Sequence, residues 1–270
     1  MRETLTRSLS GLVYILLLIG ATLYSLDSFL LLFGLFLVVC TAEFCDLVNL
    51  KKPIPIVLAV GGYVLFSYFN TFNTTNDWLL VGATLFVSIK LIIFLFSEKR
   101  QKVDKQSKYV YLIGYIVLPF IILTKIPFES TVFNPKILIG IFILIWTNDT
   151  FAYIVGKSIG KRKLYEKISP KKTIEGFLGG LIFAVISSIF IALYFIGQPV
   201  FIWIILALIS GIFGTIGDLI ESKFKRIAGV KDSGKIMPGH GGILDRLDSI
   251  IFVSPFIFLF YQILNYALIS

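Results

Sequence analysis

The stretch that decides the fold is residues 174–220, IEGFLGGLIFAVISSIFIALYFIGQPVFIWIILALISGIFGTIGDLI. It contains two apolar runs, 174–196 and 199–220, with only Gly197 and Gln198 between them. Each run has the length of about 20 residues that an α-helix needs to cross the hydrocarbon core of a bilayer. The runs are continuous rather than alternating in polarity, which favours helices over the strands of a membrane barrel.

Comparable apolar runs recur along the rest of the 270 residues. The chain is 57% hydrophobic and 15% charged, and its mean hydropathy is +0.90, whereas a soluble domain has about 25% charged residues. We therefore predict an all-α, polytopic integral membrane protein with about nine transmembrane helices, the first of them retained rather than cleaved as a signal peptide. The expected spans cover about residues 9–25, 29–47, 53–70, 77–97, 109–128, 137–156, 174–196, 199–220 and 249–268.

The basic residues predict the topology. Of the 25 Lys and Arg residues, all except Lys90, Lys125 and Lys136 fall at the N-terminus or in the second, fourth, sixth and eighth loops, which lie on one side of the membrane. The positive-inside rule then predicts a cytoplasmic N-terminus and an external C-terminus in the cell (inner) membrane. The net charge of +9 suits this topology and contact with anionic headgroups. We expect no nucleic-acid binding, because the chain has no basic-aromatic module.

The sixth and eighth loops are longer than most of the others and mix Lys, Gly, Asp, Ser and Pro. Both are expected in the cytoplasm, and both belong to the C-terminal half. We therefore divide the chain into an N-terminal region (1–73, spans 1–3), a middle region (74–132, spans 4–5) and a C-terminal catalytic region (133–270, spans 6–9).

Three carboxylates flank the eighth loop. Asp218 ends the eighth span, and Asp245 and Asp248 precede the ninth. Residues three apart share a helix face, so the last two are expected to point the same way, opposite Asp218. Carboxylate oxygens without thiols suit a hard cation such as Mg²⁺. The alternative is that these acids mark the membrane interface and pair with Lys or Arg.

A Gly-rich turn surrounds the chain's only histidine, His240, with Gly239, Gly241 and Gly242. Such a turn lets backbone N–H groups approach a phosphate closely, and the helix that follows adds a favourable field for anions. His240 is either a general acid or base or a residue that holds its loop. The cations expected to bind phosphate beside this turn are Lys223, Lys225, Arg226 and Lys231.

Two further polar blocks lie upstream. Asn148 and Asp149 interrupt the sixth span, where Asp149 must face protein or water rather than lipid. The sixth loop ends in Ser169-Pro170-Lys171-Lys172-Thr173, in which Ser169 or Thr173 is expected to cap the next helix. Lys171 and Lys172 are then placed to neutralise phosphate. The alternatives are a helix-packing contact for the first block and an interfacial anchor for the second.

At this point the residues match a family. The eighth loop resembles the signature of the phosphatidate cytidylyltransferases (CDP-diacylglycerol synthases) in the order Ser222-Lys223-Phe224-Lys225-Arg226, Lys231-Asp232, Pro238-Gly239-His240-Gly241-Gly242 and Asp245-Arg246-Leu247-Asp248. Two upstream blocks are similar to the same family, residues 146–153 and residues 169–176. The matches cover about residues 146–250.

The resemblance implies that CTP and phosphatidic acid give CDP-diacylglycerol and pyrophosphate, with Mg²⁺ required. It also implies K⁺ as a second ion and a homodimer. The residues expected to be catalytic are Asp218, Asp245, Asp248, Lys225, Arg226 and His240, and those expected to bind the metal are Asp218, Asp245, Asp248 and Asp149. The residues expected to bind substrate are Asn148, Asp149, Ser169, Lys171, Lys172, Thr173, Ser222, Lys223, Lys231, Gly239, Gly241, Gly242 and Arg246.

Three other functions stay open. A CTP-dependent lipid kinase would use similar groups but transfer the γ-phosphate. An ion transporter would place its polar groups near the midplane on broken helices, whereas most polar groups here are expected at the cytoplasmic helix ends. A purely structural membrane scaffold would need no Gly-rich acidic loop.

Overall fold

The computed structural model describes residues 2–69, 73–97, 104–129 and 131–269. Within these residues the chain forms nine continuous helical segments. They are α1 (Arg2–Tyr24), α2 (Leu26–Val48), α3 (Pro53–Tyr63) continued by η1 (Val64–Phe69), α4 (Thr74–Phe96), α5 (Lys105–Tyr111) continued by η2 (Leu112–Val117) and α6 (Leu118–Lys125), α7 (Pro135–Ile159), α8 (Ile174–Phe190) continued by η3 (Ile191–Ile196), α9 (Val200–Ala228) and α10 (Leu244–Ile269).

Eight of these segments are long and apolar enough to cross a membrane, and the remaining one, Pro53–Phe69, is a shorter apolar helix. The prediction of an all-helical, polytopic membrane protein is therefore confirmed. The expected loop between spans 4 and 5 falls partly on residues 98–103, including Lys99, Arg100 and Lys102, which lie outside the described residues.

Local sequence sets most of the helix boundaries. Polar N-cap side chains accept hydrogen bonds from backbone N–H groups of the first turn. Residues with positive φ end α2, η3 and α9, and this backbone conformation favours glycine and, to a lesser degree, asparagine. The N-caps are Ser25, Asn73, Asp104, Asn134 and Thr173. The positive-φ ends are Asn49, Gly197 and Gly229.

Two helix ends differ from the expected spans in a way that matters for the site. Helix α9 continues to Ala228 instead of ending near residue 220, and α10 begins at Leu244 instead of near residue 249. Charged side chains do not stop a helix once it leaves the hydrocarbon, since backbone hydrogen bonds continue there. As a result, the eighth loop shortens to residues 229–243, and the acids that were expected to flank it lie on helices.

Much of the sixth loop forms a short antiparallel hairpin. Strands β3 (Lys163–Tyr165) and β4 (Ser169–Thr173) pair antiparallel, with Lys163 opposite Thr173. A second short hairpin, β1 (Phe128–Glu129) with β2 (Val132–Phe133), precedes α7.

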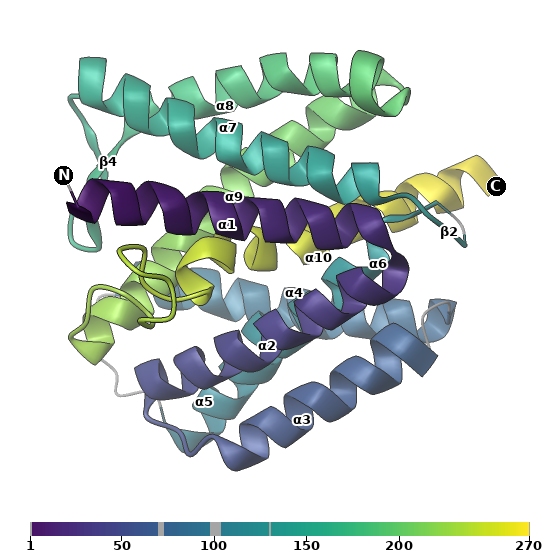
Figure 1. Ribbon diagram of the computed structural model, residues 1–270, viewed down its shortest axis with the longest axis horizontal. Helices are drawn as coiled ribbons and strands as arrows, with labels where there is room; N and C mark the ends of the chain where they lie inside the picture. Colours follow the sequence, from purple (N-terminus) through teal and green to yellow (C-terminus); the bar gives the residue numbers. More distant parts are fainter. Residues whose placement is uncertain (1, 70–72, 98–103, 130, 270) are drawn as a thin grey trace.

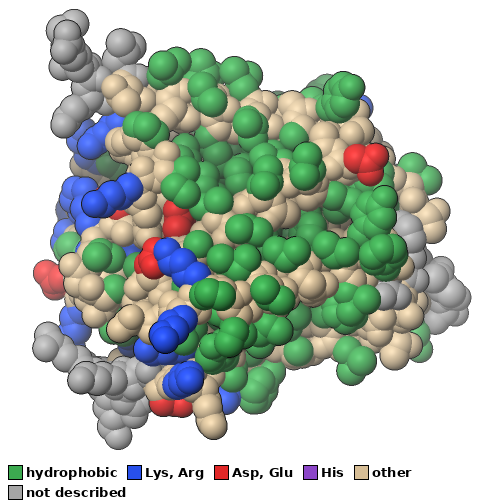
Figure 2. Space-filling view, turned by 60° about the horizontal axis from the view of Figure 1, so that its bottom comes forward, with side chains coloured by type: hydrophobic (Ala, Val, Ile, Leu, Met, Phe, Trp, Pro, Cys, Tyr) green, Lys and Arg blue, Asp and Glu red, His purple; other side chains and the backbone are tan. Residues whose placement is uncertain are grey.

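The helices run mostly lengthwise, and the two chain ends lie at opposite ends of the molecule (Figure 1). Basic side chains gather towards one end, and a hydrophobic band covers the surface beside them (Figure 2). This separation of charge from hydrocarbon is the pattern that a polytopic membrane protein requires. Which end faces the cytoplasm stays a prediction.

Helices α9 and α10 pack closely because of a glycine. A Cβ atom on Gly217 would lie 2.6 Å from the Cβ of Phe252 and 2.9 Å from the carbonyl oxygen of Asp248. Gly217 precedes Asp218, so the missing side chain brings the backbone of α9 against the turn of α10 that carries Asp248. The packing of the two helices thus sets the distance between their acids.

Candidate active site

A cluster of three carboxylates lies between α9 and α10. One oxygen each of Asp218, Glu221 and Asp248 lies within 4.8 Å of the others. Asp218 and Glu221 share a face of α9 because they are three residues apart. Glu221 is 1% exposed, and its Oε1 atom has no hydrogen-bond partner within the described part of the chain. A buried carboxylate oxygen without a partner is costly unless a cation occupies the space beside it.

Glu221 was not among the predicted residues, because the eighth span was expected to end near residue 220 and the partners of Asp218 were expected beyond the loop. A signal was available in the sequence. An acid three residues after Asp218 lies on the same face if the helix continues, which it does here.

Asp245 lies beside this cluster, but both of its carboxylate oxygens already accept hydrogen bonds from other groups. Its Oδ1 accepts a hydrogen bond from the ammonium group of Lys225 at 2.6 Å. Its Oδ2 accepts the backbone N–H groups of Ser233 and Gly242, both at 2.8 Å, and the Ser233 hydroxyl at 2.9 Å. In this structure Asp245 therefore holds the loop 229–243 in shape, and its assignment as a metal ligand stays a prediction.

Two lysines balance part of the negative charge. Lys225 contacts both Glu221 Oε2 at 2.5 Å and Asp245 Oδ1. Lys172, from β4, pairs with Asp218 Oδ2. Burial alone would lower the pKa of Lys172, but the neighbouring Asp218 carboxylate outweighs burial and raises this pKa. Lys172 therefore keeps its charge at neutral pH, and its place in the β3–β4 hairpin puts the ammonium group beside Asp218 of the cluster.

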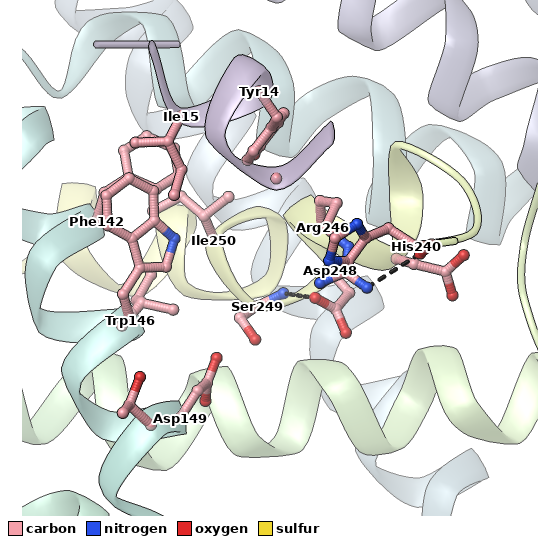
Figure 3. Close-up of a pocket in the computed structure, with 14 residues that line it drawn as sticks. Tyr14, Ile15, Phe142, Trp146, Asp149, His240, Arg246, Asp248, Ser249 and Ile250 are labelled. Carbon is pink, nitrogen blue, oxygen red and sulfur yellow. Dashed lines mark hydrogen bonds between the residues drawn. The ribbon is translucent and has the colours of Figure 1, made fainter. Parts of the chain in front are cut away.

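A cavity of about 390 Å³ adjoins the cluster through Asp248. Figure 3 shows Asp149 on α7 and Asp248 and Ser249 on α10 around its polar side, with Arg246 and His240 at one end. Its apolar wall consists of Tyr14, Ile15, Phe142, Trp146 and Ile250. The α1 residues of this wall could not be predicted, because nothing in an apolar run marks which face will cover a site.

His240 connects the Gly-rich turn to α1. Its Nδ1 atom lies 2.8 Å from the hydroxyl of Ser10, and Arg246 donates a hydrogen bond to its carbonyl oxygen at 3.0 Å. Gly239 and Gly241, on either side, have φ values of +77° and +89°, which favour glycine. Burial, together with the positive charges of Arg246 and Arg7, lowers the pKa of His240. The ring is therefore neutral at pH 7.

Several other predicted residues serve structural contacts. Lys223 donates to the carbonyl oxygens of Phe94, Leu95 and Ser97, and so caps the C-terminal end of α4. Asn148 is buried, with Gly180 of α8 and Gly211 of α9 leaving room for its side-chain oxygen.

The rest of the predicted set divides between helix ends and the surface. Thr173 caps α8 by accepting the N–H of Gly176 at 3.1 Å, so of the two alternatives for this cap the structure has Thr173, and Ser169 begins β4. Ser222 donates to Asp218 Oδ1 at 3.1 Å. Arg226, Lys171 and Lys231 are exposed. Substrate binding by these residues stays a prediction.

A second missed residue, Glu43 on α2, holds the loop from the other side. It is 5% exposed and accepts the backbone N–H groups of Ile243 at 3.1 Å and Leu244 at 2.8 Å. A Cβ atom on Gly234 or Gly242 would overlap its carboxylate. Glu43 thus caps the start of α10. An acid within an apolar run is a signal in the sequence that could have found it.

Comparison with known proteins identifies the family. A model of the cytidylyltransferase family matches residues 5–264, which is nearly the whole chain. The chain belongs to the cytidylyltransferase family. The expected resemblance is thereby confirmed.

Relatives of this cytidylyltransferase carry a more specific name. A phosphatidate cytidylyltransferase of Staphylococcus saprophyticus is 37% identical over 235 residues, covering 74% of this chain and 90% of the relative. Those of Staphylococcus haemolyticus and Bacillus subtilis are 56% identical over 116 residues and 51% identical over 117 residues. These two matches cover 42% and 43% of this chain and 44% of each relative. The enzyme class expected from the sequence, phosphatidate cytidylyltransferase, is confirmed.

Proposed function

We propose that this cytidylyltransferase joins CTP and phosphatidate to give CDP-diacylglycerol and pyrophosphate at the cavity between α1, α7 and α10. The observation that carries the proposal is the cluster of Asp218, Glu221 and Asp248 beside a cavity with one polar and one apolar side. A polar side suits the phosphates of a nucleotide, and an apolar side suits a lipid.

The residues of the cluster fit a divalent cation such as Mg²⁺. Carboxylate oxygens are the ligands that such hard cations prefer, and Glu221 Oε1 is buried without a partner among the described residues. Taken as ionised, the cluster and Asp245 carry four negative charges against the two positive charges of Lys172 and Lys225. When bound, a divalent ion would neutralise phosphate charge and stabilise the leaving pyrophosphate. The K⁺ ion implied by the resemblance stays a prediction.

The chain's own residues supply position and charge. An oxygen of the lipid phosphate attacks the α-phosphorus of CTP, and the bond from that phosphorus to the bridging oxygen of the β-phosphate breaks. The lipid phosphate is ionised at pH 7, so no general base is required. Arg246, exposed at the same end of the cavity, is available for the phosphate charge. Positioning and electrostatics then account for most of the rate enhancement.

The side of the membrane and the assembly state belong to the proposal as well. The site lies at the end of the molecule where α1 begins and α9 ends, and basic side chains gather there (Figure 2). By the positive-inside rule this end faces the cytoplasm, where CTP is available. A homodimer is proposed on the resemblance alone.

The identity of the transferred group tests the proposal. Purified protein is incubated with phosphatidate, Mg²⁺ and CTP that carries label in either the α- or the γ-phosphate. We expect α-label in the lipid product and γ-label in pyrophosphate. Label from the γ-phosphate in the lipid, with release of CDP, would instead identify a lipid kinase.

A further inference from the structure

A second cavity of about 380 Å³ lies beside the first, between α1, α2 and the eighth loop. Side chains of α1 spaced four residues apart form one wall, and they are largely exposed: Leu9 by 60%, Val13 by 54% and Leu17 by 47%. The opposite wall consists of Phe36, Ile236 and Met237. We call this space the α1 groove. From Leu9 to Leu17 the stripe rises about 12 Å along the helix axis, at about 1.5 Å per residue.

The α1 groove and the catalytic cavity meet at α1. Tyr14 lines both spaces, and Ser10, which lines the groove, forms a hydrogen bond with His240, which lines the cavity. The hydroxyl of Tyr14 is buried without a hydrogen-bond partner among the described residues. The two spaces are therefore adjacent at this part of α1.

We propose that the α1 groove binds an acyl chain of the lipid substrate while the phosphate lies in the catalytic cavity. The inference rests on the proposed function. The lining selects hydrocarbon, and the stripe begins near the polar end of α1 and runs into the apolar part of the molecule. Only 11% of the apolar stretch of α1 is buried inside the molecule. A lipid can therefore enter the groove sideways from the bilayer without crossing another helix.

Kinetics with two lipids test the groove. Val13→Trp fills it, and Leu16→Trp is the matched control, since Leu16 is 61% exposed on α1 but lines neither cavity. We expect Val13→Trp to raise the KM for long-chain phosphatidate about fivefold, a loss of about 1 kcal/mol of chain burial. The KM values for dihexanoyl phosphatidate and for CTP should not change. Equal KM values of the two variants for the long-chain lipid would overturn the proposal.

A binding readout separates this proposal from the reaction itself. The two native cysteines, Cys40 and Cys45, are free and buried, so a cysteine introduced by Val13→Cys is the accessible thiol for a maleimide. Without CTP, we expect long-chain phosphatidate to slow its labelling and to leave Leu16→Cys unaffected. Protection would persist even if the transfer reaction were wrong. Equal protection by phosphatidylcholine would mean that the groove contacts bilayer lipid in general and would overturn the proposal.

Discussion

Glu221 offers a direct test of the proposed metal site, because one of its oxygens is buried and has no hydrogen-bond partner in the described structure. We expect Glu221→Gln to lower activity about 100-fold and to raise the Mg²⁺ concentration needed for half-maximal rate, as the loss of a metal ligand does. The fold should persist, because Lys225 keeps Asp245 as a partner. The control is Glu166→Gln, an exposed residue in the β3–β4 turn. An unchanged Mg²⁺ requirement would remove Glu221 from the metal site.

Asp245 should respond differently from Glu221. Its carboxylate holds Lys225, Ser233 and Gly242, so Asp245→Asn weakens the ion pair and the loop. We expect a lower unfolding temperature, with a loss of about 3 kcal/mol, as when one partner of a buried ion pair is removed. Thermal unfolding in detergent measures it. If Asp245→Asn unfolds at the native temperature and raises the Mg²⁺ requirement, Asp245 is a ligand after all.

His240 provides a pH probe, because it is the only histidine in the chain. Burial and the charges of Arg246 and Arg7 lower its pKa, so its ring should titrate below about 6.5, the unperturbed value. Because the folded pKa is the lower one, protonation favours the unfolded state, and stability is lost as pH falls below about 6.5. NMR of the labelled ring gives the midpoint. Arg246→Ala should raise it, and a native midpoint above 6.5 would contradict this account.

Among the elements, α2 carries the contact that joins the N-terminal region to the catalytic loop. Glu43→Ala removes the acceptor for Ile243 and Leu244 and should lower the free energy of unfolding by about 3 kcal/mol, since hydrogen bonds to a buried charge are lost. Asp46→Asn on the same helix is the control, because its ion pair with Lys52 is exposed and contributes at most about 1 kcal/mol. Equal losses in the two variants, measured by thermal unfolding, would show that Glu43 is not the cap.

The elements also show how far the sequence could lead. The apolar runs predicted where helices exist, because about 20 apolar residues leave the backbone little alternative in a bilayer. Hydropathy could not predict where α9 ends or where α10 begins, since outside the hydrocarbon it no longer reports on helix formation. Asp218 and Asp248 were found as acids at the edges of apolar runs. The partnership of Glu43 with residues 200 positions later depends on packing, which no local pattern records.

For the whole molecule, the separation of charge predicts the orientation in the membrane. Val132 in the β1–β2 hairpin is 67% exposed, and Ile236 in the eighth loop is 58% exposed. We expect a cysteine introduced by Val132→Cys to react with an impermeant maleimide in intact cells. The cysteine of Ile236→Cys should react only after permeabilisation. The reverse pattern would place the catalytic cavity outside the cell.

The cap that Glu43 provides has a consequence for biosynthesis. The ribosome makes α2 long before the start of α10, and domains generally form in order from the N-terminus. During that interval the carboxylate of Glu43 on α2 cannot accept hydrogen bonds from the backbone N–H groups of Ile243 and Leu244, because those residues have not yet been made. The loop can close over it only after residues 243 and 244 have been made. A nascent or C-terminally truncated chain therefore holds most of its helices in the bilayer and yet has no assembled site.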